Sequence, residues 1–354
     1  MRLVLIVLLL LLASPAMAQT ATQQVLQAAV SQAIRPGMLV FKARASGLSI
    51  AMNALCTVPS EGTLAIVRGQ FRQAALAYGR VEFLRIGPLM EDNRADRLLF
   101  WPDRRGIGLR QVQAILAEED ATATTLDTLR GKSVAAQGFG ALEFVLYGTG
   151  SETLPGPEGA FRCRYGRTIA ANIAGIAEEL AAGWFAPDGI ADHLTAPKAA
   201  YSDYRTETEA LEALVGLLSH GVEAVRDTRI NPFLATADRP TQPKQALFWR
   251  SGLTLEMIGA DIEGMRRLLV QSGITGAVGD HYGGLGNSID FEFGNAERAL
   301  GLVTLPVDQA LADEKQVQAL NYLVIVTGSL QALIGEQLSA ALGLSVGFSS
   351  LDGD

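Results

Sequence analysis

Apolar side chains recur three or four positions apart along almost the whole chain, the spacing that places them on one face of an α-helix. The alternating pattern of a half-buried strand, rich in β-branched residues, is scarce. The pattern therefore predicts an all-α fold. The expected helical segments are 21–55, broken or kinked at Pro36-Gly37; a helix from a Thr63 N-cap to Gly87-Pro88; 109–119; a helix or helix pair through Glu143; 162–184; a helix through Leu211 and Leu218; 245–271; and 308–342.

Three segments interrupt this helical pattern. Residues 148–159 are rich in glycine and proline and are the best candidate for a domain linker. Residues 90–103 form a loop rich in charge that also holds Trp101, and 272–287 is a glycine-rich loop without the spacing of a phosphate-binding fingerprint. The helix lengths suit two antiparallel bundles joined near Pro155, an N-terminal bundle of residues 19–154 and a C-terminal bundle of residues 155–354.

The first 18 residues have the pattern of a secretory signal peptide. Arg2 supplies the positive end, Leu3 to Leu12 the apolar segment, and Ala16-Met17-Ala18 the small residues of a cleavage site. The apolar segment is shorter than the roughly 20 residues that span a bilayer, and no cysteine follows the cleavage site to carry a lipid. We therefore expect a soluble periplasmic protein that begins at Gln19 and has no later membrane span.

The net charge bears on the class of partner, and the cysteine content bears on whether the chain contains a disulfide. The formal net charge is −8, and lysine and arginine are scattered, which argues against a nucleic-acid partner. The chain has two cysteines, Cys56 and Cys163. In an oxidising compartment they could form one disulfide, which we slightly favour over the alternative of two buried free thiols.

Glu143 is the anomaly of the sequence, because this single carboxylate stands in an apolar and small-residue run, 137–148. An ionised carboxylate on such a helix face costs several kcal/mol unless it is paired, so Glu143 should have a specific partner or a raised pKa. Gly138 and Gly140 each weaken a helix by about 1 kcal/mol relative to alanine, so close approach of another element or a ligand is expected in exchange. A buried structural Glu–Arg pair is the simplest interpretation of these residues alone.

Familiar catalytic motifs are absent from the sequence. It contains no His-Glu-x-x-His, no Gly-x-Ser-x-Gly and no paired-cysteine zinc pattern. The three histidines, His193, His220 and His281, are isolated from one another, and for each a structural or capping role is the simpler interpretation. His281 in the glycine-rich loop is the one that could reach a ligand.

Several segments together carry a resemblance to a known family. Residues 137–148 are similar to a Gly-x-His-x-x-Glu signature in which Gly138 and Glu143 match and Gly140 stands at the histidine position. The chain thereby resembles the imelysin-like periplasmic proteins. The other segments that carry the resemblance are Tyr78-Gly79-Arg80-Val81-Glu82, Gly87-Pro88, Asn93-Arg94, Phe100-Trp101-Pro102-Asp103, Arg162-Cys163, Phe248-Trp249-Arg250-Ser251-Gly252 and the terminal run 347–354.

The resemblance implies an all-helical protein of two related bundles, with the signature facing a functional cleft between them. It also implies a link to iron uptake, a classification with metallopeptidases, and di-haem peroxidase-like proteins as possible partners. By resemblance the cleft would be lined by Glu143, Gly138 and Gly140, by Arg80, Glu82, Asn93 and Arg94, and by Trp249 and Arg250 from the second bundle.

The missing histidine changes the expected chemistry. Glu143 alone cannot make a zinc site, and further ligands would have to come from Asp280, His281, Asp352 or Asp354. Iron or another divalent or trivalent cation held by oxygen ligands tolerates the loss better than catalysis does. The leading hypothesis is therefore a binding protein in or beside iron acquisition. A metallopeptidase that uses Glu143 and a docking partner of a periplasmic redox protein are the alternatives.

Overall fold

The computed structural model describes residues 20–103 and 105–345, and within these ranges the chain is helical and forms no named β-strand. The expectation of an all-α fold is confirmed. The predicted signal sequence, residues 1–18, and the terminal residues Asp352 and Asp354 lie outside the described residues.

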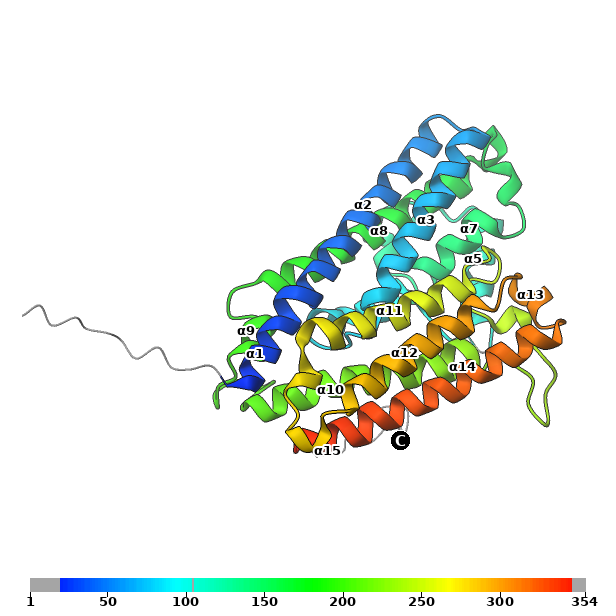
Figure 1. Cartoon of the computed structure of the whole chain (residues 1–354). Helices are drawn as coiled ribbons and strands as arrows, with labels where there is room; N and C mark the ends of the chain where they lie inside the picture. Colours follow the sequence, from blue (N-terminus) through cyan, green and yellow to red (C-terminus); the bar gives the residue numbers. More distant parts are fainter. Residues whose placement is uncertain (1–19, 104, 346–354) are drawn as a thin grey trace, which may run out of the picture.

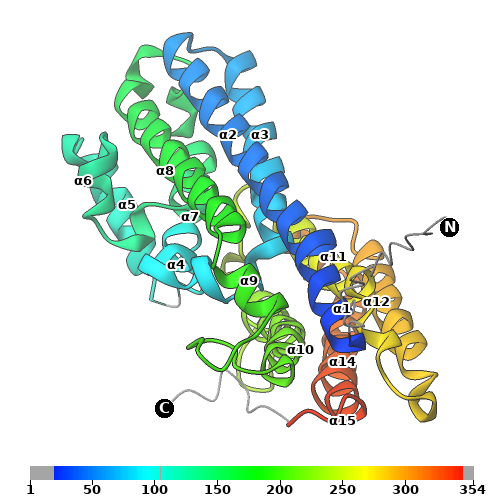
Figure 2. The same ribbon diagram turned by 90° about the vertical axis from the view of Figure 1, so that its left-hand side faces the viewer.

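One group of helices is built around a long pair, α2 and α3, with α8 beside α2 (Figures 1 and 2). Short helices α4, α5 and α6 flank α7 and α8 on the side away from α2 and α3 (Figure 2). The bounds are α2 (Arg35–Thr57), α3 (Glu61–Glu82), α4 (Arg94–Leu98), α5 (Ile107–Ala117), α6 (Leu126–Arg130), α7 (Phe139–Tyr147) and α8 (Ala160–Phe185).

A second group packs below the first in Figure 1, with α11 lying against both α3 and α12. The long helices are α10 (Glu207–Ala224), α11 (Thr254–Ser272), α12 (Leu285–Gly301) and α14 (Glu314–Ala332), and the short ones are α1 (Ala21–Ala28), α9 (Ile190–Thr195), α13 (Val307–Ala310) and α15 (Ser339–Ala341). Contacts between α3 and α11 join the two groups, so the side chains on these two helices meet in the middle of the molecule.

The predicted break at Pro36-Gly37 takes the form of a change in helix type. Residues Ala29–Ile34 form a π-helical segment, η1, between α1 and α2, and the helical path continues from Ala21 to Thr57. Pro36 stands in the first turn of α2, where a missing backbone N–H is tolerated. The wider turn ahead of it makes room for the proline ring.

Several predicted helix ends are wrong, because side-chain caps decide them. Ser60 is the N-cap of α3 and forms a capping box with Thr63, which is the third residue of the helix. The same helix ends at Glu82, before Gly87. Helix α11 begins at Thr254, about nine residues later than expected, after a turn that contains Gly252 in a left-handed conformation. Asp313 caps α14 and separates it from α13.

Helix α12 was not predicted, because the glycine-rich loop before it obscures where it begins. Leu285, Ile289, Phe293 and Ala296 are nevertheless buried at helical spacing and pack against α11 and α14.

The segment Glu314–Ala341 is, among the described residues, the one helix long and apolar enough by length and composition to cross a membrane, with a hydropathy of 1.5. Lys315, Gly328, Gly335 and Glu336 interrupt this segment. Leu320, Leu323 and Leu330 of this helix are fully buried where it packs against α10 and α12, which accounts for part of its apolar character.

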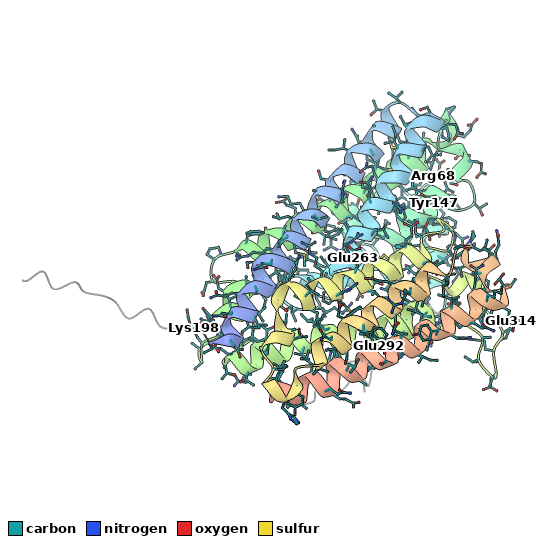
Figure 3. All side chains as sticks on the ribbon, in the orientation of Figure 1. Arg68, Tyr147, Lys198, Glu263, Glu292 and Glu314 are labelled. Carbon is teal, nitrogen blue, oxygen red and sulfur yellow. A yellow bond between two sulfur atoms is a disulfide. The ribbon has the colours of Figure 1, made fainter. Side chains whose placement is uncertain are left out.

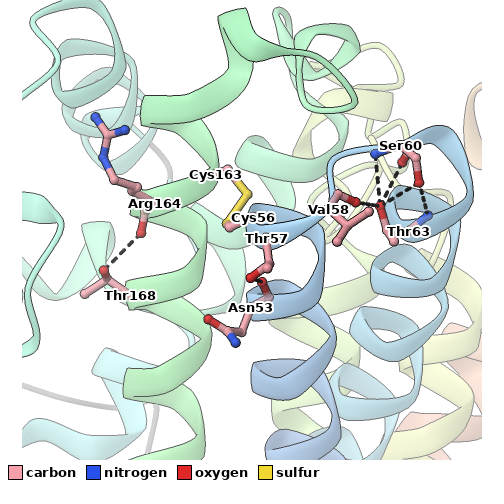
Figure 4. The surroundings of a disulfide bond; sticks show 9 residues. All are labelled: Asn53, Cys56, Thr57, Val58, Ser60, Thr63, Cys163, Arg164 and Thr168. Atoms are coloured by element: carbon pink, nitrogen blue, oxygen red, sulfur yellow. Dashed lines mark hydrogen bonds between the residues drawn. A yellow bond between two sulfur atoms is a disulfide. The ribbon is translucent and has the colours of Figure 1, made fainter.

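Cys56 and Cys163 form a disulfide, as favoured from the sequence. The bridge joins the last turn of α2 to the first turn of α8, and Figure 4 shows it beside the capping box of α3. It links a residue of the predicted N-terminal segment to one that follows the predicted linker.

Candidate functional site

Glu143 lies on α7 and is 4% exposed. Its Oε1 atom accepts two hydrogen bonds from Ser251, one from the backbone N–H at 3.0 Å and one from the hydroxyl at 2.9 Å. The Nη1 atom of Arg250 lies 3.9 Å from Oε2. The signature carboxylate therefore holds α7 to the turn that precedes α11, a contact 108 residues apart in sequence.

Burial raises the pKa of the Glu143 carboxyl above its ordinary value, while the Ser251 hydrogen bonds and the charge of Arg250 act in the opposite direction. The sequence predicted either a specific partner or a raised pKa, and the structure has both. The hydrogen-bonding partner is Ser251, and Arg250 is a more distant cation.

Aromatic rings hold Arg250 in place. Its guanidinium lies 4.4 Å from the centroid of the Trp249 ring and 5.3 Å from that of Phe144. Burial lowers the pKa of Arg250, against the effect of Glu143. The Arg250 guanidinium is thus positioned mainly by cation–π contacts, and it lies just within ion-pair distance of the Glu143 carboxylate.

Helix α7 is fixed at its other end by Arg68 of α3. The Arg68 guanidinium donates to the Leu146 carbonyl at 2.8 and 3.1 Å and lies 4.9 Å from the ring centroid of Tyr147 (Figure 3). Glu143, on the preceding turn, is therefore carried by a helix that is anchored on both sides.

The two signature glycines have different surroundings. A Cβ atom at Gly138 would lie 2.2 Å from the carbonyl oxygen of Leu98 and 2.4 Å from that of Arg97, so the close approach expected there is present. A Cβ atom at Gly140 would meet nothing within 4 Å. Packing therefore requires glycine at 138 and leaves room for a side chain at 140.

The described residues around Glu143 do not fit a metal site. Within residues 20–103 and 105–345, no group of three or more His, Cys, Asp and Glu side chains could hold a metal ion. Gly140 offers no ligand, the Oε1 atom of Glu143 already accepts two hydrogen bonds, and a guanidinium lies near the other oxygen. His281 is exposed in the turn Asp280–Tyr282, and the further candidates Asp352 and Asp354 lie outside the described residues.

Three other predicted cleft residues are not among the contacts of Glu143, and two of them, Arg80 and Arg94, have ion-pair partners of their own. Arg80 pairs with Glu263 of α11 at 2.8 Å, and Figure 3 marks the position of Glu263. Asn93 has a left-handed backbone at the start of α4. Arg94 pairs with Glu91, Asp92 and Glu179 at 2.9 to 3.0 Å.

Glu82, the remaining predicted residue, belongs to a separate cavity of ≈ 790 Å³. The cavity lies between the last turns of α3, the loop around Trp101, and helices α10 and α11. Arg229 donates to Glu82 through Nη2 at 2.6 Å, and its Nε atom lies 4.0 Å from Oδ2 of Asp261. The predicted residues are thus divided between two places, the Glu143 contact and this cavity.

Asp261 is the least expected residue of the cavity. It is 2% exposed, and neither of its oxygens accepts a hydrogen bond from an N–H or hydroxyl group among the described residues; its hydrogen-bond partner is the side chain of Glu82. Burial and the charge of Glu82 raise its pKa well above the ordinary value, while Arg229 lowers it. A Cβ atom at Gly79 would lie 2.9 Å from the Oδ1 atom of Asp261, so a residue larger than glycine at position 79 would crowd the Asp261 side chain.

Sequence reasoning missed Ser251, Arg229 and Asp261 as functional candidates. A signal for Asp261 exists, because it shares the buried face of α11 with Met257, Ile258 and Met265, the same kind of anomaly that drew attention to Glu143. Ser251 lies in the segment 248–252 that carries the resemblance, although nothing in its own chemistry marks it, and no comparable signal marks Arg229.

A family model described as imelysin (peptidase M75) matches residues 40–335, which include α7, Ser251 and the Glu82–Arg229–Asp261 group. The chain belongs to the imelysin family. No curated protein matches it.

Two solved structures have the same imelysin fold as this chain. An imelysin-like protein from Psychrobacter arcticum 273-4 superposes with a TM-score of 0.76 at 18% identity, covering 94% of this chain and 99% of that one. A putative iron-regulated protein A precursor from Parabacteroides distasonis ATCC 8503 gives a TM-score of 0.70 at 13% identity, covering 90% and 97%. At these identities the likeness establishes the fold.

The Glu143 contact predicts different results for two substitutions. Glu143→Gln keeps an oxygen that can accept from Ser251, so we expect a loss of less than about 1 kcal/mol in the free energy of unfolding. Glu143→Leu leaves the Ser251 N–H without that acceptor, and we expect a loss of about 1–3 kcal/mol. Urea denaturation measures both, and equal losses would show that the charge near Arg250 matters more than the hydrogen bonds.

Asp261→Asn tests the effect of the buried Asp261 carboxyl on stability. Because the folded-state pKa of Asp261 is raised, the folded chain holds the proton more tightly than the unfolded chain, and stability falls as pH rises from the ordinary value of 3.8 through the raised one. The variant lacks this titration, so we expect it to be more stable than wild type at pH 7 and nearly equal at pH 4. Each pH unit by which the pKa is raised corresponds to about 1.4 kcal/mol.

Thermal melts across pH 4–8 would show this, with Asp127→Asn, a substitution of an exposed aspartate on α6, as the control. A less stable Asp261→Asn at pH 7 would mean that Arg229 stabilises an ionised Asp261.

Proposed function

We propose that this imelysin-family chain is an exported binding protein that acts in or beside iron acquisition and holds its ligand in the cavity between α3, α10 and α11. The observation that carries the proposal is the ≈ 790 Å³ cavity with the partly buried Glu82 and Arg229 and the buried Asp261 on its wall. Ligand pockets of about 300–1,000 Å³, mostly apolar with a few converging polar groups, are typical of small-molecule sites.

Binding is better supported than hydrolysis by the arrangement of Glu143. A hydrolytic metal needs several protein ligands and an open position for water. Glu143 is instead hydrogen-bonded to Ser251 and lies close to Arg250, and Gly140 contributes no ligand. In this proposal Glu143 fixes the two helical groups to each other, and the ligand site is the cavity.

The support for export and for a link to iron comes from the sequence and from one structural neighbour. Residues 1–18 have the pattern of a signal peptide, and one structural neighbour is named as a precursor and as iron-regulated. A role in or beside iron acquisition, with a periplasmic di-haem peroxidase-like protein as a possible partner, is therefore part of the proposal.

The cavity offers a direct test. Mature protein would be equilibrated with a small-molecule extract of iron-starved cells, and separately with Fe(III)-citrate, Zn²⁺ and Ca²⁺, and analysed by native mass spectrometry. We expect a stoichiometric adduct that is lost in Gly216→Leu, because Gly216 lines the cavity, and its nearest side-chain neighbour would lie 3.9 Å from a new Cβ atom.

Gly69→Leu is the matched control, since Gly69 is an exposed helical glycine with open space around it. Its adduct should equal that of wild type. An adduct that persists in Gly216→Leu and disappears in Glu143→Gln would move the site to the signature. Cleavage of casein that depends on Glu143 would favour the metallopeptidase alternative, and no adduct under any condition would sink the proposal.

A further inference from the structure

We propose that the ligand of this cavity is an organic cation, whose protonated amine or guanidinium binds Asp261 while an apolar body fills the rest of the space. The inference rests on the proposed function, in that it takes the cavity as the ligand site, and it adds the chemical class of the ligand.

The ionisable side chains on the cavity wall have a negative excess. Apart from Tyr78 and His220, they are the carboxyl groups of Glu82, Asp96, Glu212 and Asp261 and the guanidinium groups of Arg85 and Arg229. Glu212 accepts hydrogen bonds from Ser345, which lower its pKa and keep it ionised. Even with Asp261 protonated, the wall holds three carboxylates against two guanidinium groups, which favours a positively charged ligand and disfavours an anion.

Asp261 marks where the cationic group would bind. Arg229 is engaged with Glu82 at 2.6 Å and comes no closer than 4.0 Å to Asp261. Apart from the carboxyl of Glu82, with which Asp261 shares a hydrogen bond, no described residue offers its oxygens a donor, and an ionised carboxylate in this state would be costly. An ammonium or guanidinium group supplies the missing N–H donors and the opposite charge together.

An organic cation fits this space better than a metal ion. No group of three ligating side chains occurs in the described residues, whereas metal sites need several. Much of the wall is apolar, including Phe83, Leu99, Trp101 and Met265, which suits a hydrocarbon body. The rings of Trp101 and Tyr78 add aromatic surface of the kind that attracts cations.

Probes that share one body and differ in the charge of one end group separate charge from shape. One set is phenethylamine, phenethyl alcohol and phenylpropionate, and a second is the ferric chelate ferrioxamine B, which has a free ammonium, with its neutral N-acetylated form. Binding would be measured by isothermal titration calorimetry at pH 7. We expect the cation of at least one set to bind at least about tenfold more tightly than its neutral and anionic counterparts.

Asp261→Asn, a nearly isosteric change, should remove that preference and leave the neutral probe unaffected, while the exposed-site control Asp127→Asn keeps it. Binding of the cation should also release a proton, seen as a dependence of the heat on buffer ionisation enthalpy, and should strengthen as pH rises. The charged and titratable groups facing Asp261 are Tyr78 and Glu82 from α3 and Arg229 from the segment after α10.

The outcomes distinguish the two proposals. Preference for a neutral or anionic probe, a preference for the cation that survives in Asp261→Asn, or no binding of either cation overturns the organic-cation inference. The proposed function stands in those cases if native mass spectrometry finds a cavity adduct that Gly216→Leu removes. If no adduct forms, the proposed function fails first.

Discussion

Replacing Cys56 and Cys163 together by alanine is expected to lower the free energy of unfolding by about 4–5 kcal/mol. The two residues are 107 positions apart, so the disulfide restricts a long loop of the unfolded chain. In the folded state it joins the end of α2 to the start of α8, two helices that already pack side by side (Figure 4). Most of the loss should therefore reflect the gain in freedom of the unfolded chain.

Urea denaturation of the variant and of wild type, each with and without reductant, measures the contribution of the bridge. Reduced wild type should lose about as much stability as the double variant, while the variant should not respond to reductant. A loss below about 1 kcal/mol would mean that the packing of α2 on α8 or residual structure in the unfolded chain already imposes the same restriction.

The helical fold could be predicted because its signal is local. Residues such as Leu64, Val67, Phe71 and Ala74 of α3 repeat at helical spacing and are buried as a face. Helix ends were less predictable, because they depend on which side chain caps the first turn. Ser60 does so for α3, and the sequence favours Thr63 equally well.

The candidate site was predictable where a residue contradicts its local surroundings. Glu143 stood out in an apolar run, and its burial and raised pKa follow from that contradiction. Its partner Ser251 did not, because a serine in a turn is ordinary and the contact spans 108 residues. Asp261 carried the same local contradiction as Glu143 on the face of α11.

Resemblance alone did not show that the implied residues separate into two places. Glu143, Trp249 and Arg250 meet at one contact, whereas Glu82 lies on the wall of the cavity with Arg229. Arg94 is engaged with three carboxylates of its own. The order of residues along a signature says which ones matter together in a family, but only the packing of α3 against α11 shows which of them share a surface.

Gly138→Ala is expected to cost about 3 kcal/mol in the free energy of unfolding. The new Cβ atom would lie 2.2 Å from the Leu98 carbonyl oxygen and 2.6 Å from its carbonyl carbon. These are backbone atoms, so relief requires α4 or α7 to move, and overpacking of this kind is costly. The movement would also displace Glu143 from Ser251, since Gly138 is the N-cap of α7.

Gly140→Ala is the matched control, two residues away on the same helix, where a Cβ atom meets nothing within 4 Å. Alanine there should leave stability unchanged or raise it by about 0.5–1 kcal/mol, because glycine weakens a helix. Urea denaturation of both variants measures the contrast. Similar free energies of unfolding for the two variants would show that α4 and α7 can move apart at little cost. In that case the glycine of the signature would reflect the needs of a ligand, and packing would not explain it.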